Sequence, residues 1–204
     1  FCLGGIPEYL QVASRYGSCD ELLRREFLAK EGYFFNELPF LLSSEFKEIK
    51  TYYSILTAIS YGKTIPVEIA GFVGIESKEL YPYLELLLMH GFIIKERCIF
   101  GGSRKTLYLI NDDFIDFWFT IVHRYRDRIE RGGFTPSQQE LLQYYGKRFE
   151  KFVRDHFRQL LDVDYAGRWW YKDREIDIVG VRENKQEIVV CEVKWQDDVD
   201  ASSI

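Results

Sequence analysis

Apolar residues recur every three or four positions along much of the chain, which predicts amphipathic helices. The clearest case begins at Glu45 and runs through FKEIKTYYSILTAIS, where one face is apolar. A short helix is expected over PVEIAGFVG, with Pro66 in its first turn. A longer helix is expected over ESKELYPYLELLLMHGFI, where Pro82 either bends it or marks its start and Gly91 ends it.

Two β-rich runs, FIIKERCIF and TLYLIND, follow these helices and flank the turn GGSRK, which predicts a hairpin. Three helices followed by a hairpin is the order of a winged helix, a variant of the helix-turn-helix. We therefore expect a winged-helix domain over residues 45–133, ending in a basic helix. Residues 1–44 are expected to form short helices and loops, one of them capped by Ser18 or Asp20.

The charges of the expected third helix argue against simple DNA binding. It carries Glu76, Glu79 and Glu85 against Lys78 and has no arginine, so its face would repel phosphate. Use of the winged helix for packing or for protein interaction is one interpretation. The other is DNA contact through the basic residues of the wing, Arg97, Arg104 and Lys105.

A second basic segment ends the helix expected over FIDFWFTIVHRYRDRIERGG. Arginines near a helix C-terminus suit the macrodipole without any ligand, so solvated charge is one explanation. A track for backbone phosphates is the other, because three of these arginines share one side of a continuous helix. They are Arg124, Arg128 and Arg131.

The segment GGFTPSQQ predicts a domain boundary. Thr135 is expected to cap the next helix, with Pro136 at its first position and Gln138 completing a capping box. The helix should continue to about Leu161, with Glu150 at the border of its apolar stripe. The stripe comprises Leu142, Tyr145, Phe149, Phe152, Val153, His156 and Leu160.

Three strands are expected next, over DVDYAG, REIDIVGVR and QEIVVCEVKW. The last two join through ENKQ, and a pairing centred on this turn places Asp177 opposite Glu192 and Glu175 opposite Lys194. Because side chains alternate in a strand, these four share one side of the sheet, provided that no bulge intervenes.

Directly opposed carboxylates destabilise a hairpin, so a bound cation is one reason for their presence. Asp177 and Glu192 offer the hard oxygen ligands that Mg²⁺ prefers, and Lys194 lies where an ammonium can stabilise charge on a phosphate oxygen. Glu150 could complete the ligand set. The alternative is a solvated charge ladder in which Lys194 bridges Glu175 and Asp177.

These residues resemble a family pattern. A helix glutamate (Glu150), the aspartate of EIDIVG (Asp177), and CEVK (Glu192 and Lys194) are similar to the PD-(D/E)XK nuclease-like superfamily, whose core is α-β-β-β-α-β. The segment GGIPEYL, the winged helix and this domain together resemble the C-terminal half of archaeal-type ATPases of the AAA+/STAND group. The resemblance implies a helical lid remnant over residues 1–44 and a nuclease-like domain over 134–204 that is truncated at its C-terminus.

The resemblance also implies a mixed α+β fold and a possible Mg²⁺- or Mn²⁺-dependent phosphodiesterase. Asp177, Glu192 and Glu150 would hold the metal, and these three with Lys194 would be catalytic. The chain lacks G-x-x-x-x-G-K-[ST], so ATP would bind in an upstream domain of a longer polypeptide. A catalytically inactive module that binds DNA or protein and reports to the ATPase is the alternative.

The net charge of -5 provides no attraction of the whole chain to a polyanion, so nucleic acid would have to bind at local basic patches. One candidate interleaves Arg168, Lys172 and Arg174 with aromatic residues in RWWYKDR. Core tryptophans with solvated charges between them would explain the same pattern.

The four cysteines lie far apart, which indicates neither a zinc site nor a disulfide framework. No apolar run is long enough to span a bilayer, so we expect a cytoplasmic protein without membrane contact. The expected partners are the upstream ATPase domain and nucleic acid. A homo-oligomer is also possible through exposed aromatic residues, Tyr33, Phe34 and Phe35.

Overall fold

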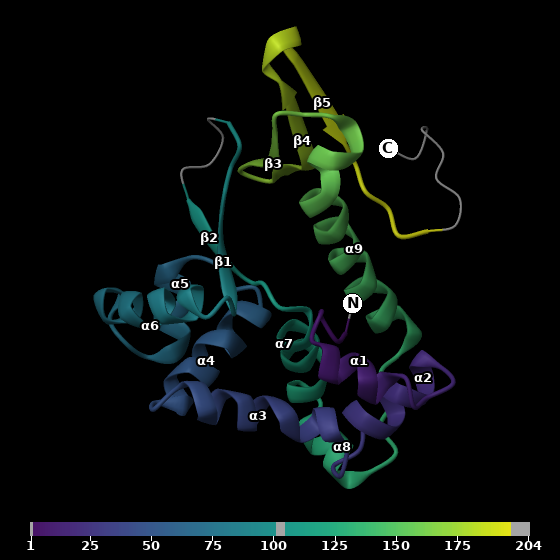
Figure 1. Cartoon of the computed structure of the whole chain (residues 1–204). Coiled ribbons are helices and arrows are strands. Elements are labelled where there is room, and N and C mark those ends of the chain that lie inside the picture. Colours follow the sequence, from purple (N-terminus) through teal and green to yellow (C-terminus); the bar gives the residue numbers. More distant parts are fainter. Residues whose placement is uncertain (1, 101–104, 197–204) are drawn as a thin grey trace. The chain divides into compact units, whose positions relative to one another are not determined.

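The computed structural model describes residues 2–100 and 105–196, and Figure 1 labels their elements. The fold is mixed α+β, as predicted. The chain divides into two compact units. Unit 1 comprises Phe1–Lys95 and Tyr108–Pro136, and unit 2 comprises Glu96–Leu107 and Ser137–Ile204. The tip of the predicted wing therefore belongs to unit 2, whereas residues 1–44 and the three-helix segment share unit 1.

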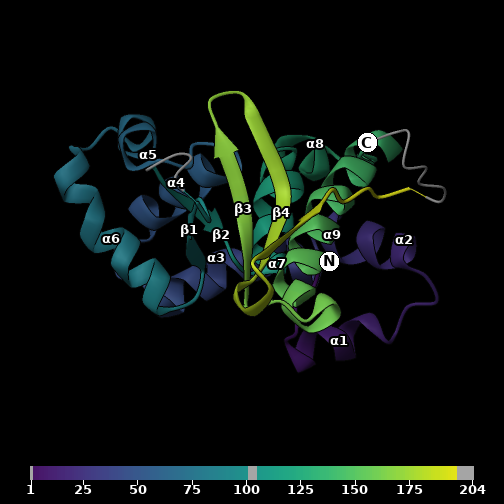
Figure 2. The same cartoon turned by 90° about the horizontal axis from the view of Figure 1, so that it is seen from above.

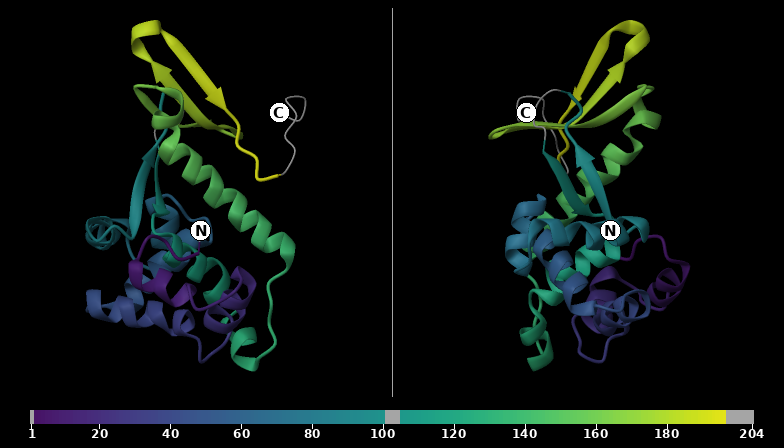
Figure 3. Two further views of the ribbon diagram at one scale, coloured as in Figure 1. Left: turned by 45° about the vertical axis from the view of Figure 1, so that its right-hand side comes forward. Right: turned by 90° about the vertical axis from the view of Figure 1, so that its left-hand side faces the viewer.

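Unit 1 is mainly helical, and none of the helices in the described ranges is long and apolar enough to cross a membrane. Two strands that continue into unit 2, β1 and β2, form a two-stranded sheet (Figure 3). The elements in chain order are α1 (Pro7–Ala13), α2 (Cys19–Leu22), a π-helical turn (Leu23–Phe27), α3 (Tyr33–Glu45), α4 (Ile49–Ser60), α5 (Pro66–Val73), α6 (Ser77–Met89), β1 (Ile93–Arg97), β2 (Thr106–Ile110), α7 (Asp113–Phe117), a second π-helical segment (Trp118–His123) and α8 (Arg126–Arg131).

The predicted order of three helices and two strands is present as α4, α5, α6, β1 and β2. The helix predicted from Glu45 instead begins at Ile49, because Phe46 is extended and ends α3. Ser18 caps α2 by accepting a hydrogen bond from the Glu21 amide. Gly91 follows α6 with a φ of 73°, a left-handed conformation that suits glycine.

The core of unit 1 is rich in aromatic rings. Phe27 stacks on Phe34 at 4.7 Å between ring centroids and meets Phe117 edge to face at 5.0 Å. The interpretation of Phe34 and Phe35 as an exposed oligomerisation surface is wrong, since they are 0% and 2% exposed. With Leu38 and Leu42 they recur at helical spacing, and this face of α3 is buried in the core.

Unit 2 pairs one long helix, α9 (Gln138–Leu161), with a three-stranded antiparallel sheet in the order β3-β4-β5. Both β3 and β4 contact α9, and Figure 2 shows β4 beside this helix. The strands are β3 (Tyr165–Tyr171), β4 (Arg174–Arg182) and β5 (Glu187–Cys191). The second strand has the predicted bounds, whereas β3 extends further than predicted and β5 ends earlier.

The cap of α9 lies two residues later than predicted. Ser137, not Thr135, is the N-cap, and its hydroxyl accepts the amide hydrogen of Glu140. The Glu140 carboxylate in turn accepts the Ser137 amide at 2.9 Å. Ser137 and Glu140 thus complete the capping box, in which a charged carboxylate replaces the predicted amide of Gln138.

The core of unit 2 lies between α9 and one face of the sheet. Phe157, Val163 and Ile178 are buried there, and Gly180 leaves room for the first two. The predicted apolar stripe is partly wrong. Its members Leu142, Phe152, His156 and Leu160 are exposed, because the sheet covers only part of the helix.

Candidate functional site

Asp177 lies at an irregularity in β4. Gly167 pairs with Val179, but the next aligned pair is Trp169 with Ile176, so Asp177 and Ile178 together oppose Arg168. This is a β-bulge, which locally changes the aim of side chains and is common beside active sites. The predicted strict alternation along β4 is therefore interrupted at Asp177.

The pairing of β4 with β5 follows the predicted register. Ile178 pairs with Cys191 and Arg182 with Glu187, which places Asp177 opposite Glu192 one step beyond the end of the ladder. After Cys191 the chain leaves the sheet, and the Val193 amide donates to Asp177 Oδ2 at 2.9 Å. Cys191 and Val193 pack on the core beside α9. Glu192 lies between these two residues in the sequence.

Asp177, Glu192 and Lys194 form an electrostatic group. Burial raises the pKa of the Asp177 carboxyl, and the nearby Glu192 adds to this, while the Val193 amide and Lys194 act in the opposite direction. The Lys194 ammonium pairs with the Glu192 carboxylate rather than with the predicted partner, Glu175. The structure thus brings together two carboxylates and one ammonium.

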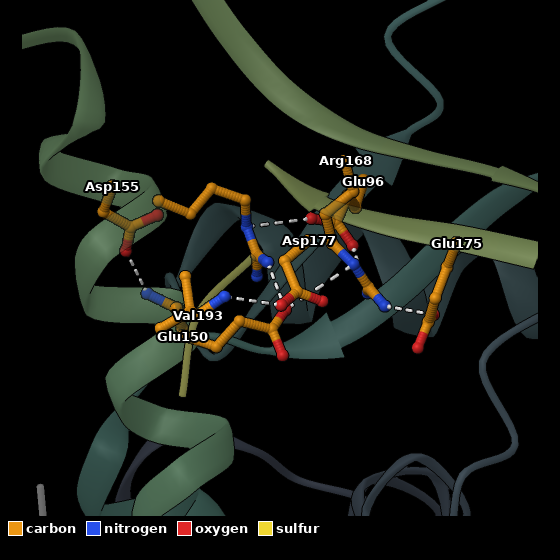
Figure 4. A network of polar contacts seen from close by, with 9 residues as sticks. Glu96, Glu150, Asp155, Arg168, Glu175, Asp177 and Val193 are labelled. Carbon is orange, nitrogen blue, oxygen red and sulfur yellow. Dashed lines mark hydrogen bonds and ion pairs between the residues drawn. The ribbon is translucent and has the colours of Figure 1, made fainter. Parts of the chain in front are cut away.

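Glu150 takes part in a network of charges within unit 2, and Figure 4 shows it beside Asp177. Its Oε1 accepts from Arg154 Nη1 at 2.7 Å and lies 3.8 Å from Arg168 Nε. Arg168 also binds Glu96 Oε2 at 3.0 Å and Glu175 Oε2 at 3.1 Å (Figure 4). Three carboxylates therefore surround two arginines from different elements.

This network is partly shielded from solvent. Glu96 and the Arg154 side chain are each 13% exposed, and they lie 3.4 Å apart between Oε1 and Nε. Burial alone would lower the pKa of the Arg168 guanidinium, but Glu96, Glu150 and Glu175 together raise it. The network therefore keeps Arg168 charged and fixes Glu150 at the surface of α9.

Sequence reasoning missed Glu96 and Arg154. Arg154 follows Glu150 by four residues, a spacing that could have indicated the ion pair. Glu96 is 72 residues away from Arg168, so no local signal reveals that contact.

Residues near Glu96 also border β3. The Ile99 amide donates to the Arg168 carbonyl at 2.9 Å, and the Trp170 amide donates to Cys98 Sγ at 3.5 Å. Cys98 and Ile99 thus contact β3 without forming a further strand of the β3-β4-β5 sheet.

Within the described ranges, no group of three or more His, Cys, Asp or Glu side chains is arranged to hold a metal ion. The predicted third ligand, Glu150, is engaged by two arginines, as described above. A metal would therefore depend on Asp177 and Glu192. Mg²⁺ is commonly held by one or two carboxylates, with waters and substrate phosphates completing the shell, so this pair fits its ligand preference.

The residues predicted to contact nucleic acid do not share one environment. Arg97, Lys105, Lys172 and Arg174 are exposed, whereas Arg168 is 20% exposed and held by carboxylates. Arg104 lies outside the described residues. On α6, Lys78 pairs with Glu76 at 2.8 Å, so the one lysine of this helix is already neutralised.

In sequence, the chain is similar to a family of unknown function and to an uncharacterised archaeal protein. Residues 118–204 match the DUF234 family, described as archaea bacterial proteins of unknown function. The chain is similar to it. A curated relative, the uncharacterized protein MJECL04 of Methanocaldococcus jannaschii, is 31% identical over 204 residues, which is 95% of this chain and 46% of the relative. The chain thus spans about half the length of that relative. No solved structure matches the chain.

Proposed function

We propose that unit 2 is a PD-(D/E)XK nuclease-like module that binds a divalent cation and cleaves phosphodiester bonds of nucleic acid. The observation that carries the proposal is the β4–β5 register, which aligns Asp177 with Glu192 and leaves Lys194 beside them. The order of α9, β3, β4 and β5 matches the start of that superfamily's core. The similarity to an archaeal family is compatible with it.

Each residue has a distinct role in this proposal. Asp177 and Glu192 would hold Mg²⁺ or Mn²⁺, which supplies a Lewis acid and a water of lowered pKa. Lys194 would stabilise the negative charge that develops on a phosphate oxygen. The Val193 amide orients Asp177 through its hydrogen bond. Glu150 would assist once substrate draws Arg154 or Arg168 away from it.

The wider setting is part of the same proposal. Helices α4 to α6 with β1 and β2 would be a winged helix, and residues 1–44 would be the remnant of an ATPase lid. The natural protein would be an archaeal-type ATPase of the AAA+/STAND group whose ATP site lies upstream, and it would act in the cytoplasm. The acidic face of α6 supports protein contact over DNA contact for this winged helix.

The test is cleavage of labelled DNA and RNA by the purified protein with Mg²⁺, Mn²⁺ or EDTA. We expect Asp177→Asn and Lys194→Ala each to lower the rate of cleavage by at least about a hundredfold. The control variants are Glu183→Gln and Lys185→Ala, in the exposed turn between β4 and β5. They remove one negative and one positive charge, as the test variants do, and should leave the rate of cleavage unchanged. Full activity in Asp177→Asn would refute the assignment.

A second candidate function is a catalytically inactive module that binds nucleic acid or protein. It is favoured by the ion pair between Lys194 and Glu192 and by the two arginines that hold Glu150. Binding of Mn²⁺ distinguishes the two. A calorimetric titration that shows Mn²⁺ binding, lost in Asp177→Asn, supports the enzyme, and no binding supports the inactive module.

A further inference from the structure

The basic segment that follows the π-helical segment Trp118–His123 comprises residues 124–131. Solvated charge does not explain its structure. The continuous helix predicted there is broken, since Tyr125 is not helical and α8 begins at Arg126. Arg124 and Arg128 nevertheless remain together, because both guanidiniums lie over the ring of Tyr125, at 5.6 and 5.7 Å from its centroid. The aromatic ring thus replaces the helix as the element that groups these arginines.

The ring of Tyr125 is itself held in place. Phe134 stacks on it at 4.6 Å between centroids. The turn between α8 and Phe134 contains Gly132 and Gly133, whose φ angles of 87° and 74° allow the chain to fold back. Arg124 and Arg128 therefore lie over a ring that a second ring holds in place, which lowers the entropy lost when a ligand binds.

The arginines of this surface are available for a ligand. Arg124, Arg128 and Arg131 are exposed, and over the described ranges no carboxylate forms an ion pair with any of them. Arg126 differs, because it bonds Glu130 at 2.9 Å. Arg126 is thus held in an ion pair, whereas the guanidinium N–H donors of the other three arginines can bind a ligand.

Helix electrostatics account for only part of this arrangement. Arg128 and Arg131 lie in the last turn of α8, where cations are favourable, but α8 has only six residues and Arg124 precedes it. The dipole also gives no reason for the position of two guanidiniums over Tyr125. A guanidinium is planar and presents a fork of donors that matches phosphate oxygens two at a time.

We infer that Arg124 and Arg128, which lie over Tyr125, form a binding surface for the phosphate backbone of nucleic acid together with Arg131, three residues beyond Arg128 in α8. Three free guanidiniums in a chain of net charge -5 make this the local basic patch that such binding requires. The surface lies within unit 1 and does not involve the proposed cleavage site. Its existence therefore does not depend on catalysis.

The test measures binding of labelled oligothymidylate and of a labelled duplex in EDTA, so that cleavage cannot contribute. The variant Arg124→Gln/Arg128→Gln/Arg131→Gln should bind about tenfold to a hundredfold more weakly at low salt. The slope of log affinity against log salt should become shallower by about 2 for single strands, since each lost contact contributes about 0.7. Replacing the three arginines by lysine should retain the slope but lose part of the affinity.

The matched control is Arg15→Gln/Lys47→Gln/Lys63→Gln, which removes three exposed positive charges from the same unit. It should bind like the wild type, and circular dichroism should show both variants folded. Equal weakening in the control would attribute binding to net charge and overturn the proposal. So would unchanged binding in the Arg124 variant, or no binding of either probe by the wild-type protein.

Discussion

Gly180 of β4 packs against Phe157 of α9, and replacing it should destabilise unit 2. A Cβ atom at this position would lie 2.8 Å from Phe157 Cε1 and 3.0 Å from Val163 Cγ1. Carbon atoms are favourably spaced at about 3.5–4.0 Å, so the ring or the strand must move by about half an ångström or more. Phe157 is 2% exposed and has no free space to swing into. We therefore expect Gly180→Ala to cost about 1–3 kcal/mol in the free energy of unfolding.

Urea unfolding followed by tryptophan fluorescence measures this loss, because Trp169, Trp170 and Trp195 lie in unit 2. The control is Gly71→Ala in α5, where a new Cβ meets nothing within 4 Å. The same substitution there should stabilise the protein by about 0.5–1 kcal/mol, since alanine is the better helix former. Adding Phe157→Leu to Gly180→Ala should recover part of the loss. Gly180→Ala as stable as wild type would refute the packing argument.

Three further predictions concern the cap, the charge network and Asp177. Ser137→Ala should destabilise α9 by about 1 kcal/mol, whereas Thr135→Ala should have little effect, and equal losses in thermal unfolding would contradict the assigned cap. Arg168→Met removes one of the two arginines that Glu96 and Glu150 share and breaks the ion pair of Glu175, so it should cost about 1–3 kcal/mol. Lys151→Met breaks the pair with Asp155, whose side chain is largely exposed, and should cost less than about 0.5 kcal/mol. The pKa of Asp177 in the folded protein is raised above its ordinary value of 3.8, so the carboxyl loses its proton more readily in the unfolded chain. The free energy of unfolding therefore falls as pH rises from 3.8 through the folded pKa. Asp177→Asn should therefore be more stable than wild type at pH 7, with an advantage that shrinks toward pH 4; an advantage independent of pH would exclude this cause.

The hairpin of unit 2 could be predicted from sequence because its signals are local. Alternating apolar residues and one polar turn were sufficient to align Asp177 with Glu192. The bulge opposite Arg168 could not be predicted, since it depends on how β3 meets β4 and leaves no mark in composition. Glu175 bonds Arg168 and not Lys194, because β5 ends at Cys191 and Lys194 lies beyond the ladder.

The cap of α9 shows how two local signals can compete. Both Thr135 with Gln138 and Ser137 with Glu140 fit the capping-box pattern, and proline at position 136 favoured the first. The structure selects the pair that includes a charged carboxylate, which is the stronger acceptor near a helix N-terminus. The network around Glu150 lay beyond such reasoning, because Glu96 reaches it from a distant part of the chain.

The tip of the hairpin that borders β3 has a consequence for any attempt to work with unit 2 alone. Glu96, Cys98 and Ile99 belong to that unit, yet the whole of α7 and α8 separates them from α9 along the chain. A contiguous clone starting at the FTPSQQ segment would lose the contacts of Cys98 and Ile99 with β3 and would leave Arg154 and Arg168 without Glu96. Unit 2 consists of two segments that are separated in sequence. It can be expressed with all its contacts only together with unit 1, or as a permuted chain that joins the two segments directly.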